Sequence, residues 1–414
     1  MRAYRLRSGR TIAPFGDSVR DLHVATKTIG EWQVEACRAC GLELIDIDSV
    51  SEIRETPAVA FWDDVFFTEM ALRQFVADCA SGGEEAQLAM PDSPVWGALA
   101  PLQDARAVEG GHAFDVFFLP KPLSAGDDRV VLRGRARPRA MPLRERAVAV
   151  RLPKVDSAPG AIQAPITARI VCTVSHWLHL LRLSQLAVGV LLLDHLRANP
   201  RRIFALRWAA RRGPWAVARK MVFVHETAEI HPTADLEAAI IGPGSIVRAH
   251  AHVHQSVLGS GVDVGDHAVV VGSTLADRVQ VLRASYLALC AAMPGGTLAS
   301  YKVQLSLFGR DVFLTSSALL LDAKLKGTVR VEQGGELIDV GTPFLGACLG
   351  HRARLGAQVA IAPGRAIPND AVIVPPPGVV AQTIGASASE GVSMIRDGRV
   401  VPIDAAPGDG ELAG

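Results

Sequence analysis

A chain of 414 residues exceeds the usual length of one domain, so we expect at least two folding units, each with its own core. Its 43 Lys and Arg residues balance 42 Asp and Glu residues, and the formal charge of +1 argues against binding of nucleic acid through a broad basic surface. Only 5% of the residues are aromatic, whereas aliphatic residues and glycine are abundant, which favours a repetitive fold with a thin core.

The first residues and the cysteines predict a cytoplasmic protein. The segment MRAYRLRSGR lacks the apolar core of a signal peptide, and the six cysteines are scattered along the chain. Cys37 and Cys40 form a CxxC pair within WQVEACRACG. Because this segment has an amphipathic helical pattern, the spacing places both cysteines on one helix face, and we interpret them as structural rather than redox or metal-binding residues.

Residues 1–122 predict an α/β domain. Helical patterns at TIGEWQVEACRACG and EMALRQFVADC alternate with strand patterns at LELIDI, AVAFWDD and AFDVFFL. Asp63 and Asp64 end one of these strands, where paired carboxylates can hold Mg²⁺ against nucleotide phosphates. The alternative is a helix cap, in which Asp64 or Thr68 begins the helix that follows.

The middle of the chain predicts a linker and then helices. Residues 123–165 are rich in Arg, Pro and Ala, and RGRARPRAMPLRER favours a solvated linker or, alternatively, a local contact with an anion. Residues 166–222 predict a helical connector, with Trp177 packed against the next domain. Its apolar run from Ile166 to Leu196 contains several charged residues and histidines, so we expect no transmembrane segment.

From Val224 the chain becomes periodic. Aliphatic residues recur with spacings of 6, 6 and 5, which complete one coil every 17 positions, at Val224, Ile230, Leu236, Ile241, Val247, Val253, Leu258, Val264, Val270, Leu275 and Val281. Small residues such as Ala234 and Ser245 recur where only a small inward side chain fits near a corner. This hexapeptide pattern predicts an all-β left-handed parallel β-helix with three sides.

The periodic region has one predicted interruption. We expect the first part of the β-helix at 223–283, an insertion at 284–340 and the last coils at 341–378. The register returns at Leu349, Leu355, Ile361, Ile367 and Ile373. Alternating segments within 284–340 predict strands that form a flap or irregular coils, and residues 379–414 predict a loose tail.

The coil length also predicts which outward side chains lie on neighbouring strands, about 4.8 Å apart. The pairs are His250 with His267, Asp235 with His252, and Glu237 with His254. A carboxylate beside an imidazole suits a general base. A solvated surface pair and a bound divalent metal are the alternatives.

The helix run KTIGEWQVEACRACGL, the acid-ended strand FWDDVFFT and the hexapeptide β-helix together resemble the bifunctional sugar-phosphate nucleotidyltransferase/acyltransferase family. The resemblance implies a nucleotidyltransferase-like first domain with Mg²⁺ on Asp63 and Asp64. It also implies acyl-CoA held in a groove between the β-helices of a homotrimer. We assign catalysis to His252, His254, Asp235 and Glu237, and cofactor binding to His250, His267, Arg352 and Arg365.

Two functions follow from these assignments. The first is acyl (acetyl) transfer from acyl-CoA to a sugar phosphate or sugar nucleotide on the β-helix. The second is a non-catalytic, trimeric sugar-nucleotide-binding or scaffold protein with a decayed nucleotidyltransferase domain. It is favoured by the reduction of the family's glycine-rich phosphate loop to SGRT, with Gly9, Arg10 and Thr11.

Overall fold

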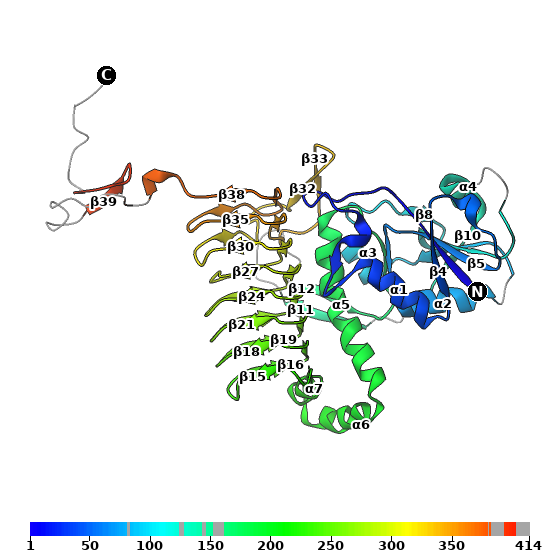
Figure 1. Ribbon diagram of the computed structural model, residues 1–414, viewed down its shortest axis with the longest axis horizontal. Helices are drawn as coiled ribbons and strands as arrows, with labels where there is room; N and C mark the ends of the chain where they lie inside the picture. Colours follow the sequence, from blue (N-terminus) through cyan, green and yellow to red (C-terminus); the bar gives the residue numbers. More distant parts are fainter. Residues whose placement is uncertain are drawn as a thin grey trace, which may run out of the picture.

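The computed structural model describes residues 1–80, 83–123, 128–142, 146–151, 161–379, 381 and 393–402. It consists of an α/β region and a parallel β-helix that lie side by side, with a long helix between them (Figure 1). This arrangement confirms the fold class predicted from the sequence.

The α/β region is built on one mixed sheet. Its strand order is β10 (Arg137–Ala140), β7 (Ala86–Met90), β9 (Gly111–Leu119), β5 (Ala58–Trp62), β1 (Arg2–Leu6) and β4 (Glu43–Ile47), and β8 (Arg106–Val108) pairs with β9. β1 runs parallel to both β4 and β5, whereas β9 is antiparallel to β5 and β7. β5 and β7 are buried along their whole length, as expected of strands covered on both faces.

Two helices of this region, α1 (Ile29–Ala39) and α2 (Glu69–Ala80), lie where the sequence predicted them, and a third, α3 (Pro94–Leu99), was not predicted. A capping box begins α1: the Thr28 hydroxyl accepts the backbone N–H of Glu31, and the Glu31 carboxylate accepts that of Thr28. Cys37 is buried, and burial raises the pKa of its thiol to about 12, which fits a structural residue.

The predicted linker at 123–165 is wrong in its described part, because this segment completes the α/β region. It forms α4 (Arg129–Arg135), β10 at the edge of the main sheet, and a hairpin of β11 (Arg146–Arg151) with β12 (Ala161–Ile166). The physical reason is charge. Asp115 is buried in the middle of β9, and Arg129 and Arg133 supply the guanidinium groups that pair with it.

A long helix, α5 (Trp177–Ala198), separates the two regions. Among the residues described it is the one helix long and apolar enough to cross a bilayer, and 67% of its most apolar window is buried inside the protein. β13 (Val171–Thr173) precedes α5 and pairs with β6 (Val65–Phe67). The chain then turns through α6 (Pro200–Ala209) and α7 (Pro214–Lys220) into the β-helix.

Three parallel sheets form the sides of the β-helix. The first contains β14 (Phe223–Val224), β17 (Ile240–Ile241), β20 (Val257–Leu258), β23 (Thr274–Leu275), β26 (Ala291–Ala292), β29 (Leu307–Phe308), β34 (Cys348–Leu349) and β37 (Ala366–Ile367). The second contains β15 (Glu229–Ile230), β18 (Ile246–Val247), β21 (Asp263–Val264), β24 (Gln280–Val281), β27 (Thr297–Leu298), β30 (Phe313–Leu314), β35 (Arg354–Leu355) and β38 (Val372–Ile373). The third contains β16 (Asp235–Glu237), β19 (His252–His254), β22 (Val269–Val271), β25 (Tyr286–Ala288) and β28 (Val303–Gln304), and β31 (Leu319–Leu320) pairs separately with β36 (Ala360–Ile361).

The coil length counted from the sequence is confirmed. Val224 pairs with Ile241, Ile241 with Leu258, and Leu258 with Leu275 on neighbouring strands of the first sheet. Ile241, Leu258 and Leu275 are buried in one core inside the β-helix. Side chains separated by one full coil in the sequence are therefore neighbours in space.

The predicted insertion at 284–340 is too long. The coils continue to Leu320, and the chain leaves the β-helix over residues 321–346, which carry a hairpin of β32 (Arg330–Gln333) and β33 (Glu336–Asp339). The 17-residue spacing in fact continues through Leu287, Ala292 and Leu298. It breaks only in the next coil, which is one residue shorter, so that Leu287 pairs with Val303 and Ala292 with Phe308. Of the predicted tail at 379–414, the described part contains a hairpin of β39 (Ser393–Arg396) and β40 (Arg399–Pro402).

The first sheet joins the two regions. Its outward residues include Ile240, Val257 and Leu307, which are buried in the same core as α5 and the α/β strands. Inward neighbours such as Leu258 belong to the separate core inside the coils. One side of the β-helix is thus covered by α5, and the other two sheets are left to carry a surface site.

Candidate functional site

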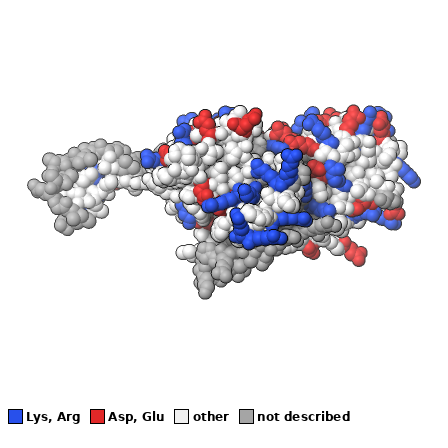
Figure 2. Space-filling view, turned by 90° about the horizontal axis from the view of Figure 1, so that it is seen from below, with Lys and Arg blue, Asp and Glu red and all other residues white. Residues whose placement is uncertain are grey.

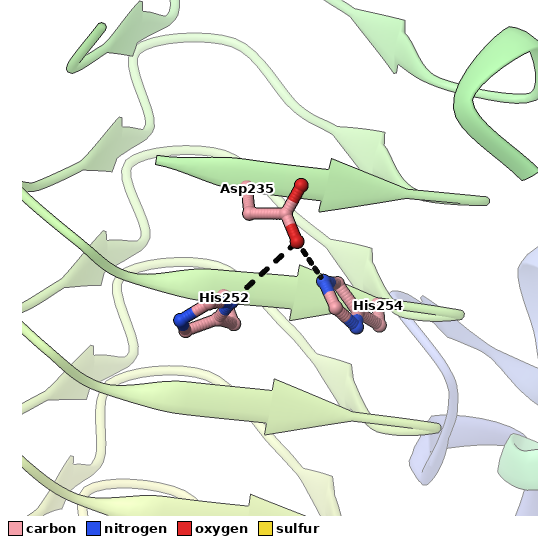
Figure 3. A group of neighbouring side chains, drawn as sticks. All are labelled: Asp235, His252 and His254. Carbon is pink, nitrogen blue, oxygen red and sulfur yellow. Dashed lines mark hydrogen bonds and ion pairs between the residues drawn. The ribbon is translucent and has the colours of Figure 1, made fainter. Parts of the chain in front are cut away.

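Asp235, His252 and His254 meet on the outer surface of the third sheet. The Asp235 carboxylate, on β16, lies between two imidazoles of the next strand, β19 (Figure 3). Its Oδ2 is 3.0 Å from His254 Nε2 and 3.6 Å from His252 Nδ1. The two rings are 5.7 Å apart and almost perpendicular. The inward side chain between them, Val253, is buried, so the alternation of the strand turns both histidines outward.

The two histidines of this site differ in exposure. The His254 side chain is 26% exposed and the His252 side chain 47%. The hydrogen bond to Asp235 occupies Nε2 of His254 and leaves its Nδ1 for another partner, which is the arrangement of a general base oriented by a carboxylate. In the part of the chain that the structure describes, these three residues are also the one group with side-chain spacing suited to a metal ion.

Arg219 closes this site on the side of α7. Its guanidinium is 3.8 Å from Asp235 Oδ1 and 3.6 Å from Glu237 Oε1. Glu237 pairs with His254 in strand register, as predicted from the coil length, but its carboxylate faces Arg219 instead of the imidazole. The carboxylate beside His254 is that of Asp235, which lies opposite His252 and is therefore the diagonal neighbour of His254 on the adjacent strand.

His250 and His267 stack as the coil length predicts. Their ring centroids are 5.0 Å apart and the ring planes differ by 21°. Both residues have positive φ angles, 57° and 58°, and occupy turns that precede the strands of the third sheet. They therefore lie at a corner of the β-helix and not on the flat face with His254, and their assignment to cofactor binding stays a prediction.

Arg352 and Arg365 belong to the last coils. The Arg352 guanidinium is paired with the Asp370 carboxylate at 2.6 and 2.7 Å. Arg365 donates to the backbone carbonyl of Arg330 on the β32–β33 hairpin. The strand order places both far along the β-helix from β16 and β19, so the structure does not bring them together with Asp235, and their cofactor role also stays a prediction.

Asp63 and Asp64 lie at the end of β5, as predicted. Asp63 Oδ1 accepts the backbone N–H of Ser8 at 2.8 Å. Asp64 faces Arg10, with Oδ2 at 3.5 Å, and Arg129, with Oδ1 at 3.3 Å. Burial raises the pKa of Asp64, and the two arginines oppose that shift. Because guanidinium groups already face the Asp64 oxygens, this arrangement does not fit the predicted Mg²⁺ site.

The sequence interpretation missed the charged cluster around these aspartates. Arg129 and Arg133 both bind Asp115, and Arg10 also contacts Asp104 at 3.1 Å. The Nη1 atom of Arg10 is buried and has no hydrogen-bond partner in the described structure. The arginine-rich stretch was the one sequence feature that could have indicated this cluster. By itself such a stretch indicates a solvated linker, because the sequence does not show that a buried carboxylate lies opposite it.

Comparisons with known proteins add little to this geometry. No family model matches the chain, and no curated protein matches it. One similar solved structure is a mutant of the GDP-perosamine N-acetyl transferase from Caulobacter crescentus in complex with CoA and GDP-perosamine. The match is 16% identical and covers 42% of this chain and 71% of that chain, with a TM-score of 0.17. At that similarity it carries no argument about the function of this protein.

Proposed function

We propose that this protein transfers an acyl group from an acyl-CoA thioester to an amine or hydroxyl of a sugar phosphate or sugar nucleotide. The observation that carries the proposal is the 3.0 Å contact between His254 Nε2 and Asp235 Oδ2 on the outer surface of the third sheet. An imidazole held by a carboxylate, with its second nitrogen free, is suited to take a proton from a neutral nucleophile.

The reaction needs one base and one leaving thiol. His254 Nδ1 removes the proton of the acceptor while its nitrogen or oxygen attacks the thioester carbonyl. The carbon–sulfur bond then breaks, and the protonated imidazole returns the proton to the departing CoA sulfur. Asp235 stabilises the charged ring between these two steps, and Arg219 holds the other oxygen of that carboxylate.

The test is release of free thiol from acetyl-CoA with a panel of amino sugars, sugar phosphates and sugar nucleotides. We expect His254→Gln to lower kcat roughly 10²-fold to 10⁴-fold. Asp235→Asn should give a smaller loss, because the base remains. His231→Gln, at an exposed histidine of the second sheet's side, is the matched control and should leave kcat unchanged. Absence of turnover by the unmodified protein across the whole panel would overturn the proposal.

Metal binding at the same three side chains is a distinct outcome of this assay. The ligand atoms of Asp235, His252 and His254 all lie within 4.8 Å of one another. A metal would occupy both histidines, so activity would then need a divalent cation and fall equally in His252→Gln and His254→Gln. Our proposal expects activity that resists a chelator and falls far more in His254→Gln than in His252→Gln.

A second candidate function is binding of a sugar nucleotide without turnover at the end of β5. It is favoured by the guanidinium groups of Arg10, Arg129 and Arg133, which gather there around buried carboxylates. A diphosphate would offer these arginines bidentate partners. Calorimetric titration with nucleoside diphosphates and sugar nucleotides should detect binding, and Arg10→Gln should weaken it if this site is used.

We also propose that the chain forms the predicted homotrimer. Two apolar side chains of the last coils are exposed on the outer surface of the second sheet, Phe313 at 44% and Val372 at 66%, with the exposed Arg354 between them in register, and Val374, just after β38, is 67% exposed. This side of the β-helix is not covered by α5, so it is free to meet further copies of the chain. Light scattering of the purified protein should give three times the 43.9 kDa mass of the chain, and a monomer would contradict this assignment.

A further inference from the structure

One segment of the connector carries a charge unlike that of the rest of the chain. We name residues 199–222, which contain α6 and α7, the basic arm. It has seven basic side chains and neither Asp nor Glu, whereas the whole chain has a formal charge of +1. All seven are exposed, namely Arg201, Arg202, Arg207, Arg211, Arg212, Arg219 and Lys220.

Most of this charge is uncompensated. Arg219 faces the carboxylates of the third sheet, and Arg212 stacks over the Trp208 ring at 3.7 Å. Arg201, Arg207 and Arg211 form no ion pair with any residue that the structure describes. Exposed cations that lack partners in their own chain form a positive surface available to an external anion.

The basic arm also exposes large apolar side chains. Phe204 is 78% exposed, Trp215 70% and Trp208 52%, and Ile203 lies beside them at 43%. Aromatic residues make up only 5% of the chain, so three exposed rings in one short segment are not a general property of this surface. Exposed rings interleaved with arginines are typical of a helix that lies at a membrane interface.

One side of the basic arm packs against the rest of the protein, and the other side is exposed to solvent. Ala209 is buried, Leu206 packs against the core, and Arg202 donates to the carbonyl of Val222 while lying 4.6 Å from the Phe223 ring. In Figure 1, α6 and α7 project at one end of the molecule, below α5. Figure 2 views the molecule from that side and shows Lys and Arg side chains gathered in its centre with few acidic ones among them.

We infer that the basic arm docks the protein on the surface of a bilayer that contains anionic lipids. The cations would meet lipid phosphates, while the rings and Ile203 enter the boundary between headgroups and acyl chains. Long arginine side chains can reach the headgroups while their stems lie against apolar surface. A nucleic acid would use the charge and stack on the rings, but it offers nothing to the aliphatic Ile203, so the lipid surface is the better match.

The test is co-sedimentation of the full chain with phosphatidylcholine vesicles and with vesicles that also contain phosphatidylglycerol. We expect binding to the mixed vesicles only, weakened by added salt. The variant Arg207→Gln/Arg211→Gln/Arg212→Gln should bind on the order of 100-fold more weakly, at roughly fivefold per lost cation near the membrane. Phe204→Ala/Trp215→Ala should lose roughly tenfold for each ring.

The matched control removes the same charge elsewhere. Arg278→Gln/Arg283→Gln/Lys326→Gln changes three exposed cations of the β-helix side and should bind the mixed vesicles like the unmodified protein. Circular dichroism checks that each variant is folded, as expected for exposed side chains. The inference is overturned if both arm variants keep full binding, or if the unmodified protein binds a DNA duplex or RNA oligonucleotide and not the vesicles. It does not depend on the acyl transfer proposed above.

Discussion

The buried histidine of α5, His179, should give the protein a calculable dependence of stability on pH. Its ring is fully buried. Nδ1 accepts the backbone N–H of Ser175 at 3.1 Å, and Nε2 donates to the carbonyl of Pro101 at 2.8 Å, so the neutral ring has both partners. Burial, aided by the nearby positive charge of Arg182, lowers the pKa of His179 to about 3.

The sign of the effect follows from proton uptake. An unfolded histidine titrates at about pH 6.5, so below that pH the unfolded chain binds a proton that the folded chain excludes until its own pKa of about 3. The contribution of His179 to the free energy of unfolding is therefore complete above about pH 6.5 and is lost as the pH falls. The loss is about 1.4 kcal/mol per pH unit, or about 2 kcal/mol between roughly pH 6.5 and pH 5.

The assay compares the unmodified protein with His179→Gln by urea unfolding, followed by tryptophan fluorescence at several pH values. Glutamine can keep an acceptor and a donor but does not titrate. His176, with a pKa lowered to about 4 by burial, titrates in both proteins, so its contribution cancels in the comparison. We expect the slope of stability against pH to be steeper in the unmodified protein by about 1.4 kcal/mol per unit. Parallel pH profiles would refute the reasoning.

Three further changes test the packing described above, each by urea unfolding at neutral pH. Leu258→Ala removes a fully buried side chain from the interior stack and should cost about 3 kcal/mol, and a loss under about 1 kcal/mol would contradict a close-packed coil. Thr28→Ala removes the capping box shared with Glu31 and should cost about 1 kcal/mol, with Thr28→Ser as the control that keeps the hydroxyl. Asp17→Asn removes the carboxylate that binds Arg310 at 2.6 Å and His351 at 3.1 Å in the β-helix and should cost about 2 kcal/mol, and an unchanged midpoint would mean that these two contacts together contribute nothing.

The β-helix could be predicted because its side chains repeat with the backbone. Each coil places one aliphatic residue on each side, so counting from Val224 to Val281 was enough to set the register of His252 over Asp235. The same period continues through Leu298 and fails only in the next coil, where Phe308 stacks on Ala292 one position earlier than the period requires. A search for one fixed coil length cannot follow the chain beyond a coil of a different length.

Charged residues limited the prediction of the α/β region. β1 lies in the middle of the sheet, yet its sequence RAYRL contains Arg2 and Arg5 and lacks the apolar run of a buried strand. Arg5 is buried because Asp46 of the adjacent β4 binds it at 2.6 and 2.9 Å. Pairing of this kind depends on which strands become neighbours, and that information is absent from the local sequence.

The loop after β1 connects the charged cluster at the end of β5 with the last coils of the β-helix. It passes Arg10, beside the buried Asp64, and reaches Asp17, which binds His351 and Arg310 of the β-helix. The Phe15 carbonyl in the same loop accepts from an asparagine of the last coils at 2.7 Å. The outer face of the first sheet shares a core with α5, so the α/β region and the β-helix form one packed body. A ligand that draws Arg10 away from Asp64 would therefore move one end of a loop whose other end is held on the β-helix by Asp17. The site at Asp235 and the site at the end of β5 therefore belong to one packed body, although each is proposed from its own side chains.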